Sequence, residues 1–263
     1  MAISHNPIFN RAMSSAEAKA AQDRAQAEVD AQFAQIVSQQ TPMTVEGAAG
    51  KVLGMFALVV GSAAITWFGI QNGLIPAGAI LPLVFGSMIV AAGLMFFASL
   101  SRKVRKGAML AYSVLEGIFL GALSLLFEVM YPGIVQSAVI STLATAGIMF
   151  AAYRFGFIKV NARFTRVMTF ALLGYLGFAV INLVVSLFTS GAGIYTTQFG
   201  WIAALIGAGL AAFSLNLDFE AIAQGAAKRL PAENEWRAAF GLVTTLIWLY
   251  MEILRLLAIF NRD

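Results

Sequence analysis

The chain has 263 residues, of which 60% are hydrophobic and 11% are charged, and its mean hydropathy is +0.81. A soluble globular domain is about half apolar and about a quarter charged, so this composition excludes an ordinary soluble protein and is typical of a membrane protein. The absence of cysteine excludes disulfides, thiolate metal sites and cysteine nucleophiles. The net charge of +4 comes mostly from short loops between apolar segments, which favours a role in membrane topology over nucleic-acid binding.

Residues 1–47 form a polar segment that is rich in alanine and glutamine. No continuous apolar stretch follows the initial methionine, so we do not expect a cleavable signal peptide. Helix-forming residues between Ala16 and Gln39 favour a helix that lies on the membrane or binds a partner, and a partly disordered tail is the alternative. The sequence predicts a polar cytoplasmic tail over 1–47 and a transmembrane domain over 48–263. The short apolar stripe in the tail consists of Val29, Phe33, Ile36 and Val37.

Seven apolar segments follow the tail, and each has about the 20 residues that cross a bilayer as a helix. Turn-forming sequences such as Gln71-Asn72-Gly73 separate several of them. The sequence therefore predicts an all-helical integral membrane protein. The predicted spans are about 50–70, 75–100, 108–130, 134–153, 167–188, 199–222 and 238–260.

The distribution of basic residues among the loops predicts the orientation of the chain. The loops after the second, fourth and sixth spans contain Lys and Arg, whereas the loops after the first, third and fifth contain neither. Positively charged loops stay in the cytoplasm. We therefore expect the amino terminus in the cytoplasm and the carboxyl terminus outside. The connection between the last two spans gives the weakest indication, because Glu233 and Glu235 accompany its basic residues.

Polar side chains occur at membrane depth in several of the predicted spans. Counting 1.5 Å per residue from the cytoplasmic ends places Asp218 and Thr245 about 10 Å deep and Glu116 slightly deeper. Asn182 and Glu252 lie roughly 20 Å or more from the same side. The pattern predicts an inner polar layer of Glu116, Asp218 and Thr245, and an outer layer of Asn182 and Glu252.

Asp218 is the strongest functional candidate among these residues. A carboxylate in hydrocarbon costs several kcal/mol, so an intramembrane acid faces a protein interior or a water-filled cavity and indicates a functional site by default. No basic residue accompanies Asp218 within its span. Glu252 has Arg255 one helical turn away, which favours a local ion pair. For Glu116, a functional role and a structural hydrogen bond are equally consistent with the sequence.

Two functions of different classes fit this pattern. The first is a pH-sensitive leak or exchange pathway for H⁺ or Ca²⁺, gated by Asp218. Burial favours the neutral form of an acid, whereas a deprotonated carboxylate attracts water or Ca²⁺, which takes oxygen ligands. We expect no cofactor and no firm metal site, with Ca²⁺ as a transported ion near Asp218. The alternative is a non-conducting scaffold that binds other membrane proteins, in which Asp218 would lie in a dry, fully paired contact.

The residue inventory argues against most enzyme classes. The only histidine is His5, in the tail, so a serine–histidine mechanism has no base in the membrane. Asp218 is the only aspartate in any predicted span, which excludes an aspartyl dyad. In the last span only Arg255 is basic, so no lysine can form a Schiff base there. We expect no catalytic activity.

Four segments, in their order and spacing, resemble the Bax inhibitor-1/YccA family, particularly its bacterial members with a long amino-terminal tail. The resemblance covers roughly residues 43–260 and implies a seven-helix bundle with the last helix near its centre. It also implies a pH-sensitive Ca²⁺ leak. We expect the protein in the inner membrane, with which the absence of cysteine is compatible. The segments are MTVEGAAGKV (Met43–Val52), LEGIFLGALSLLFEVMYPGIV (Leu115–Val135), SLNLDFEAIAQG (Ser214–Gly225) and EWRAAFGLVTTLIWLYMEILRLLA (Glu235–Ala258).

The resemblance further implies a gate in which two aspartates, one on each of the last two helices, share a proton. Asp218 matches the first, but the second falls at Thr245, which can hydrogen-bond Asp218 without sharing a titrating proton. Glu252 lies two turns further along the same helix face. A basic latch residue of some relatives has no counterpart between Pro76 and Ser101. We therefore expect Asp218 to titrate, with Thr245 as its hydrogen-bond partner.

Overall fold

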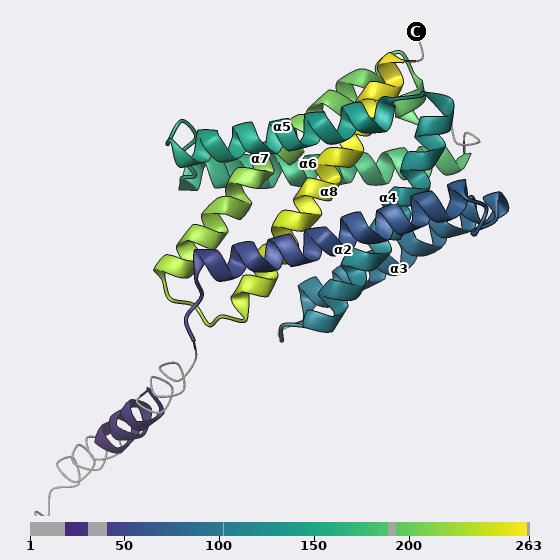
Figure 1. Ribbon diagram of the computed structural model, residues 1–263. Helices are drawn as coiled ribbons and strands as arrows, with labels where there is room; N and C mark the ends of the chain where they lie inside the picture. The colour runs from purple at the N-terminus through teal and green to yellow at the C-terminus, as the bar shows by residue number, and fades with distance from the viewer. Residues whose placement is uncertain (1–18, 31–40, 102, 189–192, 262–263) are drawn as a thin grey trace, which may run out of the picture. The chain divides into compact units, whose positions relative to one another are not determined.

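The computed structural model describes residues 19–30, 41–101, 103–188 and 193–261 (Figure 1). Residues 19–30 are helical and exposed. The predicted apolar stripe of the tail falls largely outside the described residues, which include Val29 but not Phe33, Ile36 or Val37. A compact unit spans Met43–Asp263 and is described by itself below.

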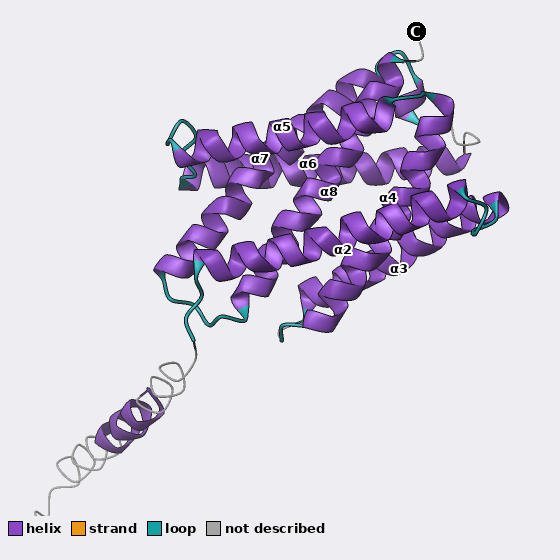
Figure 2. Ribbon diagram, viewed as in Figure 1, coloured by secondary structure: helices purple, strands orange, loops and turns teal. Residues whose placement is uncertain are grey.

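Seven helices within the described residues are long and apolar enough to cross a membrane, and Figure 2 shows helices joined by short loops. The shortest have 21 residues, which gives about 31 Å against the roughly 30 Å of a hydrocarbon core. The predicted all-helical, seven-span fold is confirmed. The helices are α2 (Val45–Gln71), α3 (Ile80–Leu100), α4 (Lys106–Met130), α5 (Ile134–Arg154), α6 (Ala162–Phe188), α7 (Gly200–Ala227) and α8 (Asn234–Phe260), and 3₁₀ turns at Ala77–Ala79 and Ile194–Thr196 precede α3 and α7.

Hydrogen bonds and an ion pair determine where helix α2 begins and connect its start to the start of α8. The Thr44 hydroxyl caps α2 by accepting a hydrogen bond from the Gly47 amide at 2.9 Å. The buried carboxylate of Glu235, in the first turn of α8, accepts from the Thr44 amide at 2.8 Å and pairs with Lys51. The Met43 amide donates to the Leu230 carbonyl at 2.6 Å. These contacts clamp the start of α8 to the start of α2.

Helix α8 lies at the centre of the bundle, as predicted, and packs against α2, α4, α5 and α7. One apolar cluster joins it to α2, α3 and α4, and a second joins it mainly to α5 and α7. Small residues allow the neighbouring α2–α4 contact, because a Cβ at Gly121 would lie 3.0 Å from both Ala63 Cα and Thr66 Cβ. Two acids of α8, Glu235 and Glu252, are therefore buried within the protein.

Helix α6 is the least packed of the seven. Only 6% of its apolar window is buried, compared with 50% for α4. It contacts α7 and the 3₁₀ turn Ile194–Thr196, and exposes large apolar side chains such as Phe170 and Ile181. In a bilayer, lipid covers such side chains, so α6 is the helix of the bundle with the greatest lipid contact.

Candidate functional site

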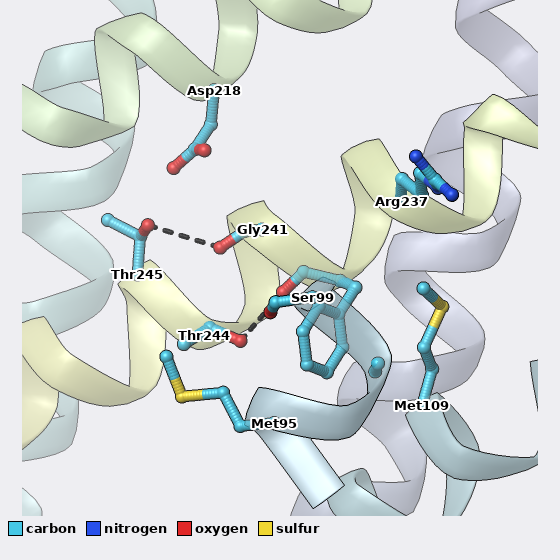
Figure 3. A pocket seen from close by; sticks show the side chains of 10 residues that line it. Met95, Ser99, Met109, Asp218, Arg237, Gly241, Thr244 and Thr245 are labelled. Carbon is cyan, nitrogen blue, oxygen red and sulfur yellow. Dashed lines mark hydrogen bonds between the residues drawn. The ribbon is translucent and has the colours of Figure 1, made fainter. Parts of the chain in front are cut away.

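Asp218 lines a pocket of about 370 Å³ between α3, α4, α7 and α8 (Figure 3). The pocket lies toward the end of the bundle at which α3 ends and α4 and α8 begin, which the sequence predicts to face the cytoplasm. Its walls combine apolar and hydroxyl-bearing side chains. They include Met95, Ser99, Met109, Arg237, Thr244 and Thr245.

The carboxyl group of Asp218 is incompletely satisfied. Its Oδ2 atom is buried and has no hydrogen-bond partner among the described residues. Its Oδ1 atom lies close to α8, where a Cβ at Gly241 would be 3.2 Å from it. The glycine thus allows α7 and α8 to approach each other at the acid. A buried polar atom without a partner is costly, so this carboxyl group favours water, a proton or a cation beside it.

Thr245 lies beside Asp218 on the facing helix, at the position that the family resemblance indicated (Figure 3). Its hydroxyl donates to the Gly241 carbonyl, with an Oγ1–O distance of 3.1 Å. Because a hydroxyl carries a single proton, donation to Asp218 would require the Gly241 bond to break. The Thr245 hydroxyl can therefore donate to only one of its two neighbouring acceptors, the Gly241 carbonyl or the Asp218 carboxylate, at a time.

Glu116 approaches the pocket indirectly, through residues that the sequence analysis missed. The buried Tyr112, one turn earlier on α4, has its hydroxyl beside both Glu116 and Thr244. Thr244 lines the Asp218 pocket, and its hydroxyl donates to the Phe240 carbonyl at 2.8 Å. The inner layer is thus a chain of polar groups around the middle of α8. The four-residue spacing of Tyr112 and Glu116 was the available signal.

A basic residue also lines this pocket, although it comes from α8 and not from the second span. The Arg237 Nη2 atom donates to the Ser101 carbonyl at the end of α3, at 3.0 Å. The two residues are 136 positions apart in sequence. The contact therefore holds α3 to α8 at one edge of the pocket.

Glu252, further along the bundle, has the opposite environment. Its carboxylate is 3% exposed and pairs with Arg255 at 2.8 Å, as the spacing predicted. It also accepts hydrogen bonds from Tyr175 Oη at 2.6 Å and Trp248 Nε1 at 3.1 Å. A buried ion pair is tolerated when further hydrogen bonds satisfy its oxygens, as they do here.

The network around Glu252 extends to α6 and to the α6–α7 connection. The Tyr175 hydroxyl lies 3.0 Å from that of Tyr195, and the Arg255 guanidinium lies 4.2 Å from the centre of the Tyr195 ring. Asn182 does not join Glu252 directly: its Oδ1 atom accepts from the Ile194 amide at 2.7 Å. The predicted outer layer is thus two separate contacts that meet at residues 194–195.

The donor set at Asp218 also bears on metal binding. No group of three or more His, Cys, Asp or Glu side chains comes together within the described part of the chain. Ca²⁺ usually takes six to eight oxygen ligands, at least some of them carboxylates. Asp218 therefore brings one carboxylate to the pocket, beside the hydroxyl groups of Thr244 and Thr245.

The comparison with protein families settles the family. The model for the family described as Bax inhibitor 1 like matches residues 6–262. The chain belongs to this family. A search of curated proteins found no match.

As a Bax inhibitor 1-like protein, the chain is a multi-pass membrane protein, and its seven helices imply residence in the lipid bilayer. Within this family member, the two most deeply placed acids of the last two helices have unlike surroundings. Glu252 is paired and saturated, whereas Asp218 is unpaired and next to a pocket. Of these two acids, Asp218 is therefore the one with an oxygen that has no partner among the described residues.

Proposed function

We propose that this protein provides a pH-sensitive pathway for cations, with Ca²⁺ or H⁺ as the permeant ion and Asp218 as the gating carboxylate. The observation that carries the proposal is the buried, unpartnered Oδ2 atom of Asp218 at the edge of a pocket of about 370 Å³. For a non-conducting scaffold we would expect Asp218 to lie in a dry contact in which both of its oxygens are paired. The unpaired oxygen and the pocket favour the pathway.

The proposed gate depends on the protonation of Asp218. A neutral acid is compatible with the apolar contacts around it and keeps the bundle closed. A deprotonated acid favours water or a cation, and the hydroxyl groups of Thr244 and Thr245 can turn toward an ion in the pocket. Flux should therefore rise with pH. Arg237 lines the same pocket, and its contact with the Ser101 carbonyl holds α3 to α8 beside the acid.

The test is Ca²⁺ flux into proteoliposomes from about pH 5 to about pH 8, the range over which a buried carboxyl group can change its charge. The native protein should show a flux that rises with pH, and Asp218→Asn should give a low flux that no longer depends on pH. Glu233→Gln is the matched control, because Glu233 is an exposed acid in the loop before α8. It should leave the profile unchanged.

Two results would count against the proposal. A pH-dependent flux that persists in Asp218→Asn would remove Asp218 from the gate. Folded native protein with no Ca²⁺ flux above that of empty liposomes would exclude Ca²⁺, and a pH-sensitive dye in the same vesicles would then test H⁺. Absence of both fluxes would favour the scaffold.

A further inference from the structure

A second pocket, of about 660 Å³, lies between the start of α6 and the last third of α7. It shares no lining residue with the Asp218 pocket. It occupies the end of the bundle at which α6 begins and α7 ends, beside the loosely packed α6. We call it the α6–α7 groove. Its lining includes Val160, Asn161, Thr165, Arg166, Leu217, Glu220 and Gln224.

The α6 side of the groove favours a negative charge. Arg166 lies one turn into the helix, is exposed, and forms no ion pair with any described residue. The Asn161 side chain caps the helix by accepting from the Phe164 amide at 2.8 Å. The start of a 27-residue helix carries a partial positive charge and backbone N–H groups suited to phosphate. Arg166 and the start of α6 therefore both attract a negatively charged group into the groove.

The α7 side favours a positive charge. Glu220 is partly buried, and its two oxygens accept hydrogen bonds from Tyr153 Oη at 2.8 Å and Gln224 Nε2 at 2.8 Å. Both donors are neutral, and no Lys or Arg of the described chain pairs with this carboxylate. Each carboxylate oxygen can accept a second hydrogen bond. Glu220 thus remains a fixed negative charge that faces the groove without a counter-ion from the protein.

Arg166 lies at the depth of the headgroup region of a bilayer, and Glu220 lies a few ångströms below it. At 1.5 Å per residue, Arg166 lies about 6 Å from the start of α6 and Glu220 about 10 Å from the end of α7. A bilayer of about 40–45 Å has a hydrocarbon core of about 30 Å, which leaves an interface several ångströms thick on each side. Lipid next to α6 has access to the groove, and Val160 and Leu217 give it apolar walls.

We propose that the α6–α7 groove binds the headgroup of a phospholipid that carries a primary amine, phosphatidylethanolamine. Its phosphate lies against Arg166 and the start of α6, and its ammonium donates to Glu220. This assignment uses both charges of the groove. Phosphatidylcholine keeps the phosphate but has no N–H to donate, and phosphatidylglycerol has no cation for Glu220. The site is independent of the proposed ion pathway, because none of its residues lines the Asp218 pocket.

The test is native mass spectrometry of the full chain in detergent, titrated with phosphatidylethanolamine, phosphatidylcholine or phosphatidylglycerol of identical acyl chains. Loss of a hydrogen bond to a charged group corresponds to about tenfold in affinity, so the native protein should prefer ethanolamine over choline about tenfold. Equal binding of these two lipids, or a preference for phosphatidylglycerol, would overturn the proposal without reference to any variant.

Two variants test which residue binds the ammonium group of the headgroup and which binds the phosphate. Glu220→Gln should abolish the preference for ethanolamine over choline while retaining the binding of both lipids. Arg166→Gln should weaken both lipids by about tenfold. Arg163→Gln is the matched control, since it removes a charge from the same end of α6 but does not line the groove. A preference that survives Glu220→Gln, or equal losses in Arg166→Gln and Arg163→Gln, would overturn the assignment.

Discussion

Asp218 and Glu252 are acids of the same helix pair with opposite degrees of satisfaction. Tyr175, Trp248 and Arg255 donate to Glu252, whereas the Oδ2 atom of Asp218 has no partner among the described residues. Both acids violate the rule that hydrocarbon excludes charge, so burial alone does not separate a structural acid from a functional one. The difference lies in the hydrogen bonds. An acid whose oxygens all have hydrogen-bond partners holds helices together. An acid with an unpartnered oxygen can still accept a hydrogen bond from water, take up a proton or bind an ion.

The largest expected effect is on stability, from removing the cation beside Glu252. Arg255→Leu leaves a buried carboxylate without its counter-ion, and we expect the free energy of unfolding to fall by about 3–5 kcal/mol. Thermal and denaturant unfolding in detergent would measure it. The double variant Arg255→Leu with Glu252→Met replaces the pair by apolar side chains and should recover most of the loss. A single variant as stable as the native protein would show that the ion pair is not structural.

The next effect comes from one neutral donor to the same carboxylate. Tyr175→Phe removes hydrogen bonds to Glu252 and Tyr195, and we expect a loss of about 1.5–3 kcal/mol, the range for hydrogen bonds to charged groups. The control is Tyr131→Phe, whose hydroxyl has no partner within the described chain. Equal unfolding midpoints for the two variants would contradict the saturated network.

Glu235 is an intermediate case, because it retains neutral donors when its cation is removed. Lys51→Met leaves the Thr44 amide at 2.8 Å and the Thr44 hydroxyl at 3.3 Å from Glu235. We expect a loss of about 1 kcal/mol in the same unfolding measurement. Lys103→Met, at an exposed lysine of the α3–α4 loop, should have no effect. A loss of stability as large as that of Arg255→Leu would show that Glu235 depends on its cation as strongly as Glu252 does.

The smallest effect on stability is expected at Asp218. Asp218→Asn keeps an oxygen that can accept from Thr245 and removes the cost of burying a charge, so stability should stay constant or rise by up to about 1 kcal/mol. Unfolding should be compared in the same detergent as for Arg255→Leu. A loss of more than about 2 kcal/mol would indicate a partner for Asp218 and would favour the scaffold over the ion pathway.

The fold was largely predictable from the sequence, because hydropathy and turn-forming residues determine which segments cross the membrane. The central position of α8 followed from the family resemblance, and the Glu252–Arg255 pair from a three-residue spacing. Helix ends were less predictable. Helix α7 continues to Ala227, past the predicted end near 222, so Glu220 lies further inside the helix than the sequence indicated.

The partners of the polar residues were not predictable, because they come from distant parts of the chain. Tyr175 is 77 positions from Glu252 and Ser101 is 136 from Arg237, and helical periodicity does not say which helices are neighbours. Tyr112 and Thr244 were missed for the same reason. Asn182 was placed with Glu252 on depth alone, although depth gives no information on which side of a helix faces which neighbour.

The position of the two threonines has a mechanical consequence for α8. Contacts to other helices hold α8 at its start, where Glu235 pairs with Lys51 of α2, and near its end, where Glu252 accepts from Tyr175 of α6. Between these two contacts, the hydroxyl groups of Thr244 and Thr245 donate to backbone carbonyls of the preceding turn, a pattern that often bends helices. Gly241, which has no side chain, lies in the same segment. The segment of α8 that bends most readily is therefore the one that faces Asp218. A change of charge at Asp218 therefore acts on the segment of α8 that lies between its two anchored ends.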